Sequence, residues 1–333
     1  MPHKLLRMQR TELQRTQTQG TQTQGTQTHR SDSPRPLDTR PVMLAIAGDS
    51  AVGKTTITAG LVRALGEARC TSVCVDDYHR FDRQERKGLP FTALHPDCNY
   101  VDIMEQQLQL LATGHPILKP VYDHHTGRLA RPQYVEPREF VIVEGLLPLH
   151  TKLAAACFDI TVFLGPPEDI RRGWKIKRDT GERGYAREQV LKELDRREPE
   201  SERFIRPQRR HADIVVRFGP VEQRDDPPGT PLSAELLLRP TIRHPDLSEV
   251  LAESVSMHLT LTRDEDGRPV DALHVHGYAP REDSQVLEKA IWSGLGEGTE
   301  LPGFLGELAG GQRSEPLAVT QLLLLYHLLE ASR

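Results

Sequence analysis

The sequence lacks the features that would place it in several specialised classes of protein. Its apolar runs, such as LLLLY at 322–326, are far short of the roughly 18 residues that a membrane-spanning helix needs. Its 43 Lys and Arg are outnumbered by 47 Asp and Glu, so the positive excess of a dedicated nucleic-acid binder is missing. The N-terminal residues hold no apolar segment of the kind found in secretory signals. We therefore expect a cytoplasmic protein with neither a membrane nor a nucleic acid as partner.

Cysteine is scarce as well. The four cysteines, Cys70, Cys74, Cys98 and Cys157, are too few for a disulfide framework in a chain of 333 residues. None of them shows the paired CxxC spacing of a structural zinc site. We expect reduced thiols that act as small packing residues, as is usual in the cytosol.

Three segments differ in composition. Residues 1–39 are rich in Thr, Gln and Gly, with the repeat TQTQG, and hold too little apolar surface to fold, so we predict a disordered tail. A Gln-rich association tract is the alternative. A stretch rich in proline and acid at 221–231 then separates a core at 40–220 from a C-terminal extension at 221–333.

Apolar runs and helical patterns alternate along the core. This alternation predicts an α/β fold with a mostly parallel, doubly wound sheet. After residue 231 the pattern changes to a strand, a hairpin with DEDG at its turn and a C-terminal helix, so we expect antiparallel strands that extend the same sheet. The predicted strands of the core lie at 42–48, 72–77, 139–145, 158–165 and 212–219, and its clearest helices at 55–65 and 101–114.

The segment GDSAVGKT at 48–55 matches the pattern G-x-x-x-x-G-K-[ST] of a phosphate-binding P-loop, after a strand and before a helix. Glycines let backbone N–H groups approach phosphate oxygens, and the helix N-terminus adds partial positive charge. In this pattern Lys54 reaches the β- and γ-phosphates and the Thr55 hydroxyl binds Mg²⁺. We predict an ATP site formed by Gly48, Asp49, Ser50, Ala51, Val52, Gly53, Lys54, Thr55 and Thr56.

Carboxylates end two of the predicted strands. Asp76 and Asp77 end the strand at 72–77, and Glu144 lies near the end of the strand at 139–145. Ligands of open α/β sheets bind beyond the carboxyl ends of the strands, so these acids can accept a proton from an attacking hydroxyl or hold Mg²⁺. A solvated loop or a helix N-cap would use the same residue types.

Histidine and basic residues follow in three places. The stretch HRFDR at 79–83 suits an anionic substrate. The stretch YDHH at 122–125 lies in a predicted loop bounded by Pro and Gly, a pattern that on its own is typical of any surface loop. His274 and His276 share one face of a predicted strand, and without a third ligand nearby they indicate a pair on a sheet face.

Residues 171–210 hold 14 Lys and Arg against 8 Asp and Glu. Arg171, Lys175 and Arg178 share one helical face, and the pairs 175–179, 178–182 and 179–183 fall at i,i+4. One interpretation is a helix with exposed salt bridges, each contributing about 0.2–0.5 kcal/mol. The local positive excess favours the other, a lid that closes over a phosphate, where one arginine can contribute about 10³–10⁵ in rate.

Together, the segments DDYHRFDR, KPVYDHHTG, IVEGLLP and WKIKRDTGERG resemble the phosphoribulokinase branch of the phosphoribulokinase and uridine kinase family over residues 42–218. The resemblance implies phosphorylation of D-ribulose 5-phosphate at O1 by ATP, with Mg²⁺ as cofactor, to give ribulose 1,5-bisphosphate and ADP as in the Calvin cycle. It also implies a homo-oligomer, a dimer or larger.

The resemblance also implies residue roles. Asp76 would be the base that accepts the proton of the sugar hydroxyl, and Thr55 and Glu144 would hold Mg²⁺. The residues implied to contact the sugar phosphate are His79, Arg83, Tyr122 and His124. Those implied to act in catalysis with Asp76 and Lys54, on the closing basic segment, are Lys175, Arg178, Asp179 and Arg183.

Two alternatives and one departure accompany this interpretation. A related kinase could phosphorylate uridine or pantothenate, but a neutral nucleoside would not need so many basic residues. A non-catalytic nucleotide sensor would keep Lys54 and tolerate loss of Asp76 and Glu144. Plant-type members carry a P-loop cysteine where this chain has Val52, so we expect no thiol switching through a disulfide to Cys74.

Overall fold

The computed structural model describes residues 40–333 apart from 222–226, 228, 296–300 and 309–310. The predicted disordered tail at 1–39 lies outside the described residues. All described residues belong to one compact unit, Leu37–Arg333. Among the described helices, none combines the length and apolar character needed to cross a membrane.

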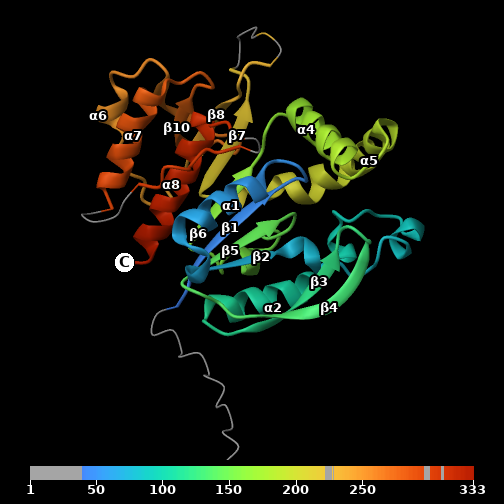
Figure 1. Ribbon diagram of the computed structural model, residues 1–333. Helices are drawn as coiled ribbons and strands as arrows, with labels where there is room; N and C mark the ends of the chain where they lie inside the picture. Colours follow the sequence, from blue (N-terminus) through green and yellow to red (C-terminus); the bar gives the residue numbers. More distant parts are fainter. Residues whose placement is uncertain (1–39, 222–226, 228, 296–300, 309–310) are drawn as a thin grey trace, which may run out of the picture. The chain divides into compact units, whose positions relative to one another are not determined.

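An eight-stranded sheet with the order β2-β5-β1-β6-β7-β8-β10-β9 forms the centre of this unit (Figure 1). Neighbours from β2 to β7 are parallel, whereas β8, β10 and β9 pair antiparallel. The predicted α/β class and the antiparallel extension are both confirmed. The strands are β1 (Val42–Gly48), β2 (Cys70–Cys74), β5 (Phe140–Gly145), β6 (Ile160–Leu164), β7 (Ile214–Gly219), β8 (Ser233–Leu238), β9 (Met257–Arg263) and β10 (Pro269–Val275).

Helices cover both faces of the sheet. Strand β1 is buried along its whole length because it lies between β5 and β6. Its residues Leu44 and Ile46 pack with α1, α7 and α8, and Met43 packs with α2 and α3 on the other face, so the strand is apolar throughout. The longer helices are α1 (Lys54–Leu65), α2 (Val101–Ala112), α4 (Glu168–Gly181), α5 (Arg187–Glu200), α7 (Arg281–Ser293) and α8 (Glu315–Ala331), and the short ones α3 (Lys152–Ala155) and α6 (Ser248–Leu251).

One prediction about local structure is wrong. The segment KPVYDHHTG is not a loop: it forms the end of β3 (Ile117–Asp123) and the turn into β4 (Arg128–Val135), a two-stranded ribbon beside the main sheet. The register shifts between Lys119 and Val121, at Pro120, which cannot donate to the ladder. This irregularity hides the strand in the sequence.

The basic segment at 171–210 forms α4, α5, a π-helical turn (Ser201–Ile205) and a 3₁₀ helix (Arg206–His211), and then enters β7. In Figure 1, α4 and α5 lie together on the side of the sheet away from α6 and α7.

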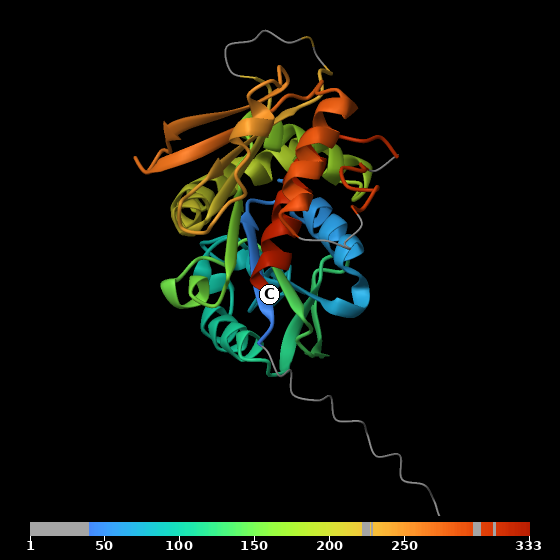
Figure 2. The same ribbon diagram turned by 90° about the vertical axis from the view of Figure 1, so that its left-hand side faces the viewer.

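Helix α8 of the C-terminal extension packs along α1, the helix that follows the P-loop (Figures 1 and 2). Gln321 fits against Gly60, where a Cβ atom would lie only 2.1 Å from the Gln321 amide nitrogen. Its Nε2 donates to the Thr56 carbonyl oxygen at 3.1 Å, and its Oε1 accepts from the Gly306 N–H at 2.8 Å. The extension is thereby bonded directly to the P-loop helix.

A buried histidine pair makes stability depend on pH. His327 Nε2 lies 3.1 Å from His244 Nδ1, and burial lowers the pKa of His327 to about 3. The folded state therefore keeps His327 neutral, whereas the unfolded chain takes up a proton near pH 6.5. This contribution to stability is complete above pH 6.5 and is lost as the pH falls below it.

We predict that His327→Gln weakens this dependence. Between pH 6.5 and 5, wild type should lose about 2 kcal/mol more unfolding free energy than the variant. Urea unfolding at the two pH values measures the difference. An equal loss in both proteins would show that His327 takes up its proton equally readily in the folded and unfolded states.

Candidate active site

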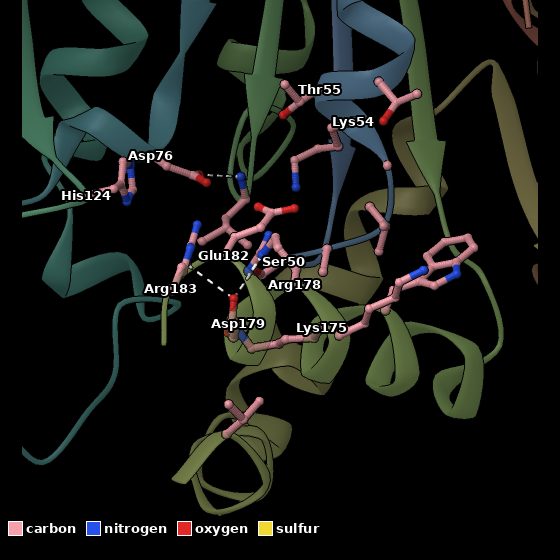
Figure 3. Close-up of a pocket in the computed structure, with 18 of the residues that line it drawn as sticks. Ser50, Lys54, Thr55, Asp76, His124, Lys175, Arg178, Asp179, Glu182 and Arg183 are labelled. Carbon is pink, nitrogen blue, oxygen red and sulfur yellow. Dashed lines mark hydrogen bonds and ion pairs between the residues drawn. The ribbon is translucent and has the colours of Figure 1, made fainter. Parts of the chain in front are cut away.

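A cavity of about 1650 Å³ lies over the carboxyl ends of the central strands (Figure 3). Its lining comes from the P-loop, the segment after β2, the β3–β4 ribbon, the basic helices and the C-terminal extension. Single small-molecule pockets usually measure about 300–1,000 Å³. The cavity therefore has room for two ligands side by side.

The P-loop has an unusual backbone. Gly48 and Gly53 have positive φ angles of 147° and 96°, and Ala51 has 68°. A Cβ atom at Gly48 would lie 2.5 Å from the Leu164 carbonyl oxygen of β6, so glycine is needed for that close approach. The Lys54 ammonium lies 2.8 Å from the carbonyl oxygens of both Gly48 and Asp49. The loop thus holds its cation at the point where phosphates would bind.

The P-loop is also bonded to the basic segment. Asp49 is buried and accepts a hydrogen bond from Ser201 of the π-helical turn, and Arg171 of α4 lies 3.9 Å from it. Arg178 donates to Ser50 Oγ at 3.2 Å. Both ends of the basic segment therefore contact the loop.

The two adjacent aspartates have different environments. Asp76 lines the cavity, and its Oδ1 accepts from the Leu146 N–H at 2.7 Å (Figure 3). Asp77 instead forms an ion pair with the buried Lys119 and accepts from the Tyr122 N–H at 3.2 Å. Asp77 therefore holds the β3–β4 ribbon, and of the two aspartates only Asp76 lines the cavity.

Glu144 lies beside the first turn of α1. Its two carboxylate oxygens are 3.3 Å from the hydroxyls of Thr55 and Thr58. Burial raises the pKa of Glu144, although Lys54 nearby works in the opposite direction. Hydroxyl and carboxylate oxygens are the ligands that Mg²⁺ prefers, so this donor set fits the predicted metal.

Histidine and tyrosine rings line the side of the cavity next to Asp76. His79 is only 3% exposed, and its Nδ1 lies 2.6 Å from Asn99 Oδ1. Burial, followed by the charge of Arg86, lowers the pKa of His79 to about 3, so the ring is neutral. It meets the Tyr122 ring edge-on with centroids 4.7 Å apart, and Tyr122 in turn meets His124.

Arginines fix this wall in position. Arg86 donates to the Tyr122 hydroxyl at 2.5 Å. Arg83 donates to the carbonyl oxygens of His124 at 2.6 Å and His125 at 3.4 Å, so it braces the turn of the ribbon. The resemblance implied a direct substrate contact for Arg83. In this structure the guanidinium lines the cavity but is bonded to the turn.

The basic helix α4 carries a network centred on Asp179 (Figure 3). Lys175 Nζ is 2.7 Å, Arg178 Nε 2.9 Å and Arg183 3.5 Å from its carboxylate. Two of the predicted i,i+4 pairs are confirmed, but Arg178 bonds Asp179 and Ser50 rather than Glu182. Burial lowers the pKa of Lys175 to about 8 against the opposing effect of Asp179.

The chain matches the model of a known protein family. Residues 43–224, more than half of the chain, match the model of the phosphoribulokinase / uridine kinase family. The chain belongs to this family.

This chain spans about half the length of the phosphoribulokinase relatives that it matches. A phosphoribulokinase of Synechocystis is 40% identical over 187 residues, which are 56% of this chain and 56% of that protein. A uridine kinase of Streptococcus equi subsp. zooepidemicus is 32% identical over 187 residues, 54% of this chain and 88% of its own. The solved phosphoribulokinase of Rhodobacter spheroides has a TM-score of 0.56 at 16% identity and covers 76% of this chain and 96% of its own, a likeness of fold.

The cavity brings together nearly all the residues that the family resemblance indicated. Only Gly48 and Asp49 of the predicted site residues are not in its lining. The sequence pattern did not single out Arg86, Lys87 or Arg197, which also line the cavity. Their basic character was the available signal, but Arg and Lys are common on any surface.

The remaining candidates are two histidines and the four cysteines, of which Cys74 lines the cavity. His274 of β10 stacks on His258 of β9, whereas His276 follows the end of β10 and stacks on Tyr278. Within the described part of the chain, no group of three His, Cys, Asp or Glu could hold a metal. All four cysteines are free thiols, and Cys70 and Cys98 are buried as expected.

The buried Lys119–Asp77 pair generates a prediction about stability. Lys119→Met should leave the Asp77 carboxylate buried without its partner and lower the free energy of unfolding by about 3–5 kcal/mol. Asp76→Asn should cost under about 1 kcal/mol, because its amide oxygen can still accept from Leu146. Urea unfolding of both variants measures the contrast, and equal losses would place the structural role on both aspartates.

Proposed function

We propose that this chain is a phosphoribulokinase that transfers the γ-phosphoryl group of ATP to O1 of D-ribulose 5-phosphate. The observation that carries the proposal is the placement of Asp76 and Lys54 on facing sides of one cavity whose acceptor side is strongly basic. The names of the phosphoribulokinase relatives support it. Phosphoryl transfer requires mainly positioning and charge stabilisation, and this cavity can supply both.

The donor phosphates would bind on residues 48–55, where Lys54 and the backbone N–H groups at the start of α1 neutralise them. Asp76 would accept the proton of the C1 hydroxyl of the sugar. Its hydrogen bond from Leu146 orients the carboxylate, and the cavity gives it access to the acceptor. The lid residues Arg178 and Arg183 would neutralise the transferring group.

Thr55 and Glu144 would hold Mg²⁺, which when bound neutralises phosphate charge in reactions of this class. Their oxygens already lie together at 3.3 Å, beside the loop that would receive the β- and γ-phosphates. This arrangement supports the predicted cofactor.

The charge of the acceptor side favours a sugar phosphate over a neutral nucleoside. Arg86, Lys87 and Arg183 line it together with Arg196 and Arg197. A phosphate group offers these cations several acceptor oxygens, whereas uridine offers no anion. The cytoplasm and a homo-oligomeric state belong to the proposal through the family resemblance, and the free thiols agree with a reducing compartment.

We predict that Asp76→Asn lowers kcat by about 10²–10⁴-fold with little change in the KM for ATP, because it removes the proton acceptor and leaves the P-loop unchanged. The measurement is ADP release with Mg-ATP and ribulose 5-phosphate, uridine or no acceptor. Glu182→Gln is the matched control, since it removes a carboxylate from the same cavity.

Three outcomes separate the possibilities. Stimulation of wild type by ribulose 5-phosphate alone supports the proposal. Stimulation by uridine alone would mean that the acceptor is a nucleoside. Near-normal turnover of Asp76→Asn with ribulose 5-phosphate would remove Asp76 from the role of base.

A further inference from the structure

Asn99 is a buried amide that lies behind His79, outside the lining of the large cavity. It follows the 3₁₀ turn Pro96–Cys98, and its backbone pairs with that of His79. We propose that Asn99 is a positioning residue. It makes His79 present an unprotonated Nε2 to the cavity, where this nitrogen accepts a hydrogen bond from a hydroxyl group of the sugar phosphate. The proposal rests on the proposed function.

The hydrogen bonds of Asn99 determine which way its amide points. Its Nδ2 donates to the carbonyl oxygens of Ala93 at 3.1 Å and His95 at 2.9 Å. Because carbonyl oxygens only accept, the opposite orientation would place the amide oxygen against two other acceptors. The atom that faces His79 is therefore Asn99 Oδ1.

This orientation decides the tautomer of His79. Asn99 Oδ1 can only accept, and it lies 2.6 Å from His79 Nδ1, so Nδ1 carries the proton and donates it. Burial, followed by the charge of Arg86, lowers the pKa of His79 to about 3, so the ring is neutral and Nε2 keeps its lone pair. The ring lines the cavity, and within the described part of the chain no hydrogen bond reaches Nε2. Nε2 is therefore the nitrogen left for a ligand.

An unprotonated nitrogen selects the kind of group that it can bind. A hydroxyl can donate to it, whereas a phosphate dianion has only acceptor oxygens and would be repelled. Arg86 and Lys87 line the same side of the cavity and carry the positive charge that a phosphate requires. His79 would therefore bind a hydroxyl of the sugar, and the neighbouring cations would bind its phosphate.

Backbone hydrogen bonds hold the two side chains in this arrangement. The Arg80 N–H donates to the Cys98 carbonyl oxygen at 2.9 Å, and the Tyr100 N–H donates to the Tyr78 carbonyl oxygen at 2.8 Å, one bond on each side of the pair. The Tyr122 ring meets the imidazole edge-on and limits its rotation. Because the nitrogen is already in position, little conformational entropy is lost when the sugar binds.

NMR spectra of the full chain labelled with ¹⁵N-histidine measure the tautomer directly. Two-bond nitrogen–proton correlations distinguish protonated from unprotonated ring nitrogens, and the signals that are missing from His79→Gln identify those of His79. Wild type should show a protonated Nδ1 and an unprotonated Nε2, and Asn99→Leu should lose this signature because the acceptor is gone. Gln107→Leu is the matched control and should keep it, since the Gln107 amide accepts from the neighbouring Tyr78 hydroxyl at 2.6 Å instead.

ADP release with Mg-ATP identifies the group that binds to Nε2. Ribulose 5-phosphate is compared with its 3-deoxy and 4-deoxy analogues, which keep the phosphate and the C1 hydroxyl. In wild type one analogue should lose about tenfold in kcat/KM, and in His79→Phe this loss should disappear, because both changes remove the same neutral hydrogen bond. Asn99→Leu should raise the KM for ribulose 5-phosphate about threefold or more with kcat within about twofold, whereas Gln107→Leu should change neither.

Several results would overturn the inference. A protonated Nε2 in wild type does so without any variant, so the test does not depend on whether Asn99→Leu folds. The same losses for the deoxy analogues in wild type and His79→Phe would mean that the hydroxyl binds elsewhere, and the proposed function would stand. Spectra and KM of Asn99→Leu like those of wild type would remove the positioning role of Asn99. If ribulose 5-phosphate does not stimulate ADP release by wild type, the proposed function fails, and the sugar hydroxyl fails with it.

Discussion

The site depends on the two hydrogen bonds that hold the Lys54 ammonium inside the P-loop. The Lys54 side chain is only 9% exposed, and the carbonyl oxygens of Gly48 and Asp49 accept hydrogen bonds from its Nζ at 2.8 Å, which offsets the cost of its burial. These carbonyls are available because β1 ends between β5 and β6 and the backbone turns sharply at Gly48. The buried parallel sheet therefore fixes the position of the Lys54 ammonium. That position determines where phosphates would bind.

Three other parts of the molecule are tied to that loop. Asp49 connects it to Arg171 and Ser201, which lie at the start and near the end of the basic segment at 171–210. Gln321 connects the C-terminal helix to the first turn of α1. Glu144 of the neighbouring strand reaches Thr55. The basic segment, the extension and the residues proposed to hold the metal are thus positioned relative to the same loop, as a transfer between two bound substrates would require.

Strands and motifs that depend on a local sequence pattern could be predicted from the sequence. Side-chain roles that depend on contacts between distant residues could not. The five parallel strands were recognisable because burial on both faces requires continuous apolar runs. Asp76 and Asp77 are adjacent in sequence, so only the position of Lys119, on a strand 42 residues away, distinguishes the carboxylate that lines the cavity from the one that forms an ion pair. Arg83 was readable as basic, but its bonds to the ribbon's carbonyl oxygens belong to tertiary structure. Helix α7 was missed because its buried face includes the polar Ser284 and Glu288.

The charges on helix α4 fit the proposed role of the basic segment as a lid that responds to a phosphate. Lys175, Arg178 and Arg183 share the single carboxylate of Asp179, which is almost fully buried. Burial alone would raise the pKa of Asp179, but the hydrogen bonds and charges of Lys175 and Arg178 lower it. Three cations around one anion leave an excess of positive charge that is costly to bury. In the proposed reaction, the phosphoryl group would supply the missing negative charge, so closure of the lid would be coupled electrostatically to the presence of the group that it transfers.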